Sequence, residues 1–92
     1  MSKNINAEIK DILPNWSIVD NKLSLQIKTK HFQESMHLAN LITFIAERHD
    51  HHPDLLIKYS SITIELYTHT TGTITEKDLQ LAKKINELID LI

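Results

Sequence analysis

Three of the six histidines stand out as residues that could do chemistry. His51 and His52 are adjacent and precede Pro53, while His69 follows Thr68 in a separate segment. An imidazole has an unperturbed pKa of about 6.5, so it can give or take a proton near neutral pH. A cluster of this kind therefore indicates either proton-transfer chemistry or metal binding.

The paired histidines come directly after the end of a predicted helix. The negative end of the helix dipole there favours a protonated imidazole, and Glu47, four residues before His51, would do the same. A protonated histidine beside a cleft is what a general acid needs. The plain alternative is a solvated helix end, where histidine is common, and composition alone favours it.

His69 and Asp78 each have a structural and a chemical interpretation. His69 falls on the polar face of a predicted strand, close to a loop that contains the single glycine, so it is either an exposed strand residue or a site residue. Asp78 lies three residues after Thr75 and could complete a capping box at the start of a helix. Asp78 could also serve the site.

Metal binding is the main alternative to acid–base chemistry. His49, Asp50, His51, His52 and His69 hold enough nitrogen and oxygen ligands for zinc or nickel. Adjacent side chains usually point apart, however, and no His-x-x-x-His pair occurs on a predicted helix. Proton transfer is therefore favoured, and we expect no metal at this site.

The elements that must position these side chains follow from hydrophobic spacing. Residues 5–13 are predicted to form a short helix that ends before Pro14. Residues 16–19 and 23–27 alternate apolar and polar side chains on either side of the turn-forming residues 20–22, which predicts a β-hairpin.

The second half of the chain repeats this order. Residues 30–48 have helical spacing and predict a largely buried helix that Pro53 keeps from continuing. Residues 55–59 and 62–69 predict two strands, and residues 75–92 predict a final helix with an apolar stripe. We therefore expect an α+β fold in the order α-β-β-α-β-β-α, an antiparallel four-stranded sheet with three helices on one face.

Length and composition set further bounds. A chain of 92 residues fits one domain, residues 1–92, with a small core. The net charge of −2 provides no basic patch for nucleic acid, and the lack of cysteine excludes disulfides and thiolate zinc sites. Without an apolar leader or membrane-length run, we expect a cytoplasmic protein with no membrane partner.

From about residue 9 onwards the chain resembles the pterin-4a-carbinolamine dehydratase family. The spacing from His-His-Pro to Thr-His to Thr-x-x-Asp is the most specific part of the match. The residues that carry the resemblance are Trp16, Phe32, Ala46, Glu47, His51, His52, Pro53, Tyr59, Thr68, His69, Gly72, Thr75, Asp78, Leu79 and Ala82. Asn15, Leu55 and Ile74 depart from common family residues, which bears on the fit of the substrate side chain.

The resemblance implies dehydration of a 4a-hydroxytetrahydropterin to the quinonoid dihydropterin without a metal or organic cofactor. It implies that His51 and His69 are general acids on the two ring faces, and that His52 binds the pterin and acts as a base. The implied supporting residues are Glu47, Pro53, Asp78, Thr68 and Trp16.

We also expect a homodimer or homotetramer, because the last helix ends in more apolar surface than one small sheet covers. Two alternatives from other classes stay open: a non-catalytic assembly partner of the same fold, and a small histidine-based metal-binding protein.

Overall fold

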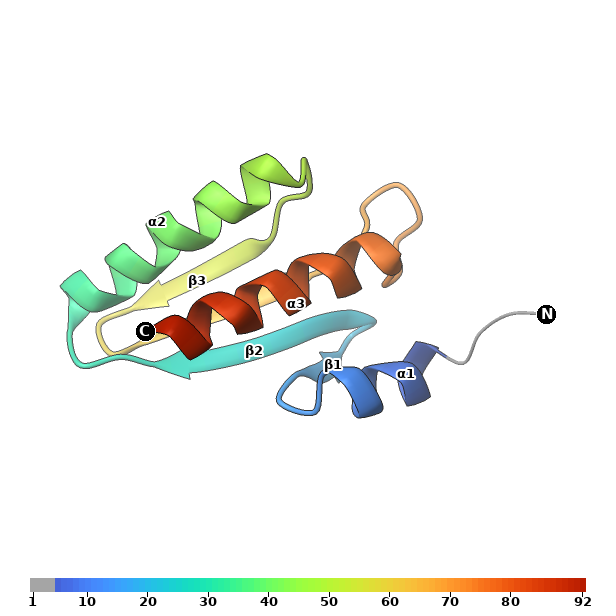
Figure 1. The fold of residues 1–92 in the computed structure, drawn as a ribbon, viewed down its shortest axis with the longest axis horizontal. Helices are drawn as coiled ribbons and strands as arrows, with labels where there is room; N and C mark the ends of the chain where they lie inside the picture. Colours follow the sequence, from blue (N-terminus) through green and yellow to red (C-terminus); the bar gives the residue numbers. More distant parts are fainter. Residues whose placement is uncertain (1–4) are drawn as a thin grey trace.

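An antiparallel four-stranded sheet carries its helices on one face (Figure 1). The computed structural model describes residues 5–92. The elements are α1 (Ile5–Ile12), β1 (Ser17–Val19), β2 (Lys22–Lys28), α2 (Phe32–Arg48), β3 (Asp54–Lys58), β4 (Ser61–Leu66) and α3 (Glu76–Leu91). The predicted fold class and element order are confirmed. None of these helices, within the described residues, is both long and apolar enough to cross a membrane.

The strands lie in the order β1-β2-β4-β3, so β2 and β4 form the centre of the sheet. The β1–β2 hairpin turns at Asp20 and Asn21, whose φ angles of 52° and 63° are both positive. A two-residue type I′ turn requires this conformation, and Asp and Asn tolerate it. Lys22, predicted in the turn, is the first residue of β2, and Trp16 precedes β1 rather than beginning it.

The core forms between the inner face of the sheet and the helices. Inward-facing pairs such as Leu23 with Leu66 and Leu25 with Ile64 line up across β2 and β4. The buried apolar residues are Ile9, Leu13, Trp16, Leu23, Leu38, Ala39, Ile42, Ala46, Ile62, Ile64, Leu66, Leu79, Leu81, Ala82 and Ile85. Each large member contributes roughly 1.5–3 kcal/mol relative to exposure, which holds α2 and α3 against the sheet.

The expectation that α2 is largely buried is wrong. Its buried residues form one stripe, namely Ser35, Leu38, Ala39, Ile42 and Ala46. Phe32, Met36 and Leu41 are exposed, and Phe44 is 63% exposed. A helix that lies on one face of a sheet covers a single stripe of its surface, and these four side chains lie outside it.

The end of α2 sets the position of the paired histidines. Asp50 has a φ of 49°, and its N–H donates to the Glu47 carbonyl at 3.3 Å. The His51 N–H donates to the Ala46 carbonyl at 3.2 Å, which completes a Schellman motif. The helix therefore ends at Arg48, five residues before Pro53, and this capping motif rather than Pro53 terminates it.

Candidate active site

One cleft, of about 290 Å³, collects side chains from three separate segments. They come from the connection between α2 and β3 together with the first residue of β3, the loop after β4, and the first turn of α3. The lining residues are Asp50, His51, His52, Pro53, Asp54, Thr68, His69, Thr70 and Lys77. The structure thus brings together the three histidines that the sequence singled out.

His51 is held by a carboxylate from another element. Its Nε2 lies 2.5 Å from Oδ1 of Asp78, 27 positions further along the chain. The imidazole is 11% exposed and the Asp78 side chain is fully buried. An ionised carboxylate only accepts hydrogen bonds, so Nε2 carries the proton and Nδ1 is the nitrogen left to act on a ligand.

Asp78 is the centre of a buried polar network. Its Oδ2 accepts a hydrogen bond from the Thr68 hydroxyl at 2.9 Å and another from the Thr75 N–H at 2.8 Å. The two threonine hydroxyls are hydrogen-bonded to each other at 2.6 Å. A buried carboxylate is costly without such partners, and here every bond also orients the group that holds His51. The predicted capping box is confirmed.

His52 is held by a carboxylate at the surface. Its Nε2 is hydrogen-bonded to Oε2 of Glu47, and both side chains are mostly exposed. Glu47 therefore pairs with His52, while His51 pairs with Asp78. The left-handed turn at Asp50 is the reason, because after it His51 reaches α3 while His52 reaches back to the last turn of α2.

His69 lies just beyond the end of β4. The alternation of burial predicted for this strand continues past Leu66, since Thr68 is buried and His69 is exposed. Thr68 forms a bridge with Thr73, and Gly72 has a φ of 68° in the loop between them. This tight loop directs the His69 ring to the cleft, while Thr68 points inwards to Asp78.

Of the supporting residues expected from the sequence, some line the cleft and one does not. Pro53 and Thr68 line the cleft. Trp16 does not, because it is buried in the core and its Nε1–H donates to Oδ1 of Asn86 at 2.9 Å. Lys77 lines the cleft and was missed, although its place beside Asp78 in the first turn of α3 was a usable signal.

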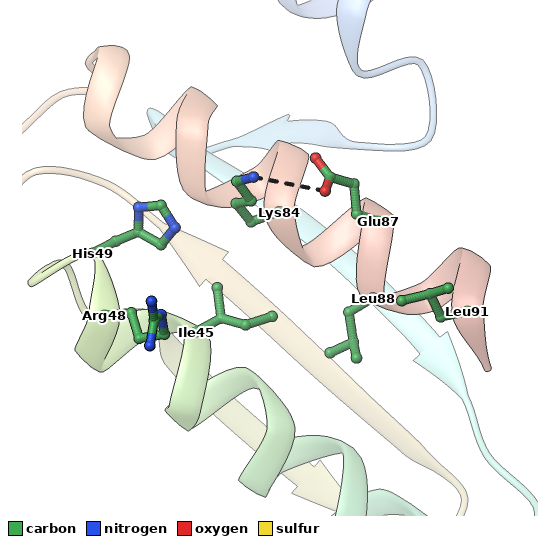
Figure 2. A pocket seen from close by; sticks show the side chains of 7 residues that line it. All are labelled: Ile45, Arg48, His49, Lys84, Glu87, Leu88 and Leu91. Carbon is green, nitrogen blue, oxygen red and sulfur yellow. Dashed lines mark ion pairs between the residues drawn. The ribbon is translucent and has the colours of Figure 1, made fainter.

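A larger groove, of about 490 Å³, lies between α2 and α3 and is lined by other residues (Figure 2). These are Ile45, Arg48, His49, Lys84, Glu87, Leu88 and Leu91. Lys84 and Glu87 form an exposed ion pair at 3.7 Å, so the groove has no buried charge comparable to Asp78. Across the part of the chain that the structure describes, no three histidine, aspartate or glutamate side chains group as a metal site would need.

Comparisons with known proteins agree with the fold. Residues 2–88 match the family model for pterin 4 alpha carbinolamine dehydratase. A Sulfolobus acidocaldarius protein with the provisional name pterin-4-alpha-carbinolamine dehydratase is 46% identical over 76 residues, covering 83% of this chain and 84% of that protein. A Picosynechococcus protein of the same provisional name is 43% identical over 84 residues, covering 91% of this chain and 90% of that protein.

Two solved structures share the architecture. The crystal structure of a transcriptional coactivator/pterin dehydratase from Brucella melitensis has a TM-score of 0.84 and 27% identity, and covers 95% of both chains. A pterin dehydratase-like protein identified as a RuBisCO assembly factor in the alpha-carboxysome has a TM-score of 0.63 and 14% identity. It covers 79% of this chain and 84% of its own, and it shows a shared fold. The match over nearly the whole sequence establishes that this chain belongs to the pterin-4a-carbinolamine dehydratase family.

Proposed function

We propose that this protein dehydrates 4a-hydroxytetrahydropterins to quinonoid dihydropterins, with its histidines as general acid and base. The observation that carries the proposal is the convergence of His51, His52 and His69 on one cleft, with two of the rings oriented by carboxylates. Membership of the family and the names of the relatives support the same substrate class.

The reaction is an elimination that these groups can serve without a net gain or loss of protons. The C4a–O bond breaks as an acid protonates the departing hydroxyl, which leaves as water. The N5 electron pair forms the new N5–C4a double bond, and a base takes the N5 proton. General acid and base groups positioned in this way typically accelerate such steps by about 10²–10⁴-fold each.

In the proposed division of labour, His51 and His69 are the acids on the two faces of the pterin ring. They approach the cleft from different segments, one after α2 and one after β4. His52 binds the pterin and takes the N5 proton, with its ring oriented by Glu47. Asp78 and Thr68 hold His51, and Pro53 shapes the wall of the cleft.

The direct test is the rate of 4a-hydroxytetrahydropterin dehydration by the purified protein, followed spectroscopically with each 4a-epimer. We expect the protein to turn over both epimers. For each epimer, dialysis against a chelator should leave the rate unchanged, since the proposal needs no metal or organic cofactor. Dehydration no faster than the uncatalysed reaction for either epimer would reject the enzyme. A rate lost on chelation and restored by one metal would instead favour the metal-binding alternative.

An assembly role is the second candidate. The Brucella relative is named both as a coactivator and as a pterin dehydratase, and the exposed apolar side chains of α2 provide a surface for association. Phe44 is the most exposed aromatic ring on α2, and the Arg48 guanidinium lies 5.8 Å from its centroid. A folded protein that does not dehydrate either epimer would favour the assembly role over the dehydratase activity.

We also propose that the protein is a homodimer or homotetramer that associates through the outer face of α2. Leu41 and Phe44 lie on that face, and exposed Leu91 borders the neighbouring groove (Figure 2). Burying such side chains against a second copy removes apolar surface from water.

Light scattering is expected to show a dimer or tetramer for the native chain and a smaller species for Phe44→Glu. Gln33→Glu is the matched control, since it adds the same charge at an exposed polar position of α2 and should leave the assembly unchanged. A native chain that stays monomeric at high concentration would contradict the proposal.

A further inference from the structure

The three imidazoles of the cleft differ in what holds them. His51 is fixed by the buried Asp78, and His52 by the exposed Glu47. Within the described residues, the His69 ring makes no hydrogen bond and no ion pair, but it lies against the ring of Tyr67. An exposed side chain without such a contact would change rotamer on the picosecond to nanosecond timescale, which is unfavourable for a positioned acid.

The contact between Tyr67 and His69 is close and directional. The two ring centroids are 4.3 Å apart, and the planes are inclined by 45°. Tyr67 is half-buried, and it is two residues before His69 in extended chain, so both side chains lie on the same side. Tilted ring pairs at this separation are attractive, and a protonated imidazole gains further from the face of a tyrosine ring.

Tyr67 is itself held from the neighbouring strand. The pairing of Leu23 with Leu66 places Lys22 opposite Tyr67, and the Lys22 ammonium lies 4.6 Å from the centroid of the tyrosine ring. The same ammonium is 4.0 Å from Oε1 of Glu65. A chain of contacts thus runs from β2 through the Tyr67 ring to the His69 ring.

We propose that Tyr67 is a positioning residue that orients the His69 imidazole towards the cleft, a role that rests on the proposed acid function of His69. Tyr67 does not line the cleft, so it acts through His69 rather than on the pterin. Both contacts are made by the ring of Tyr67 and neither requires its hydroxyl, so a phenylalanine at this position keeps them.

The kinetic test uses the 4a-epimer whose dehydration depends on His69. Tyr67→Ala is expected to lower kcat on this epimer by about tenfold with little change in KM, because a misplaced acid loses part of its advantage. Tyr67→Phe should stay within about twofold of the native rate. In a His69→Ala background, Tyr67→Ala should cause no further loss of kcat on this epimer. An equal loss from Tyr67→Ala in both backgrounds, or on both epimers, would overturn the proposal.

A measurement that does not require enzyme activity tests the positioning of His69 by Tyr67 separately from the proposed dehydration. Histidine ring protons are followed by NMR in the native, Tyr67→Phe and Tyr67→Ala proteins, with His52 as the internal control. The His69 ring protons should show the ring-current shift of an aromatic neighbour in the first two proteins and lose it in the third. Unchanged His69 signals in Tyr67→Ala would overturn the positioning role, whereas the expected shifts in an inactive protein would support it and reject only the enzyme.

Discussion

Alanine in place of either His51 or His69 is expected to lower the dehydration rate by about 10²–10⁴-fold while the protein stays folded. Both residues line the cleft, and in the proposed mechanism each substitution removes the acid for one face of the pterin ring. The leaving hydroxyl occupies one ring face in each 4a-epimer, so the two variants should lose activity on opposite epimers. That opposite bias is the signature of two acids on two faces.

Steady-state rates on both epimers, with thermal melts of the same samples, test this prediction. His37→Ala is a matched control, because His37 is an exposed histidine of α2 that does not line the cleft. Full activity of both histidine variants on both epimers would remove the acid–base proposal and leave the assembly role ahead.

Replacing Asp78 with alanine is expected to have the second large effect, on the dehydration rate and on the free energy of unfolding. As a helix cap alone it would contribute about 1 kcal/mol. Its buried carboxylate is also hydrogen-bonded to His51, Thr68 and the Thr75 N–H. Asp78→Ala therefore leaves these three groups without that hydrogen-bond partner. We expect a loss of roughly 2–4 kcal/mol in the free energy of unfolding, together with a loss of activity.

Asp78→Asn separates the two roles. The amide oxygen still accepts from the Thr75 N–H, but the amide nitrogen then donates to Nε2 of His51, which must become an acceptor. His51 then cannot carry a proton on both nitrogens while it keeps this bond, and the doubly protonated ring is the form that the proposed general acid needs. The rate should fall by about 10²-fold or more, with a smaller loss of stability than in the alanine variant.

Glu47→Gln is the matched control for this carboxylate. The Glu47–His52 pair is mostly exposed, and exposed pairs contribute about 0–1 kcal/mol. Denaturant unfolding should therefore change little in Glu47→Gln, which makes this variant a control for stability and not for rate, since Glu47 orients His52 in the proposed mechanism. Equal losses of stability from the two carboxylate-to-amide substitutions would show that the burial of Asp78 has no special consequence.

Local sequence determined the elements of this protein and part of its site. The change from alternating to helical spacing depends on near neighbours in the chain, so the order of helices and strands was predictable. The capping box at Thr75 and Asp78 is equally local, because its partners are three residues apart. The alternation that carried the prediction from Ile62 to His69 holds even beyond the end of β4.

Tertiary structure alone decided which groups meet. The left-handed residue Asp50 ends α2 and sends His51 to Asp78, while His52 returns to Glu47, and no spacing rule specifies this exchange. The exposure of Phe44 likewise depends on which stripe of α2 contacts the sheet. Sequence periodicity is a property of one element, whereas these pairings depend on how separate elements pack, and packing is decided by contacts between residues far apart in the chain.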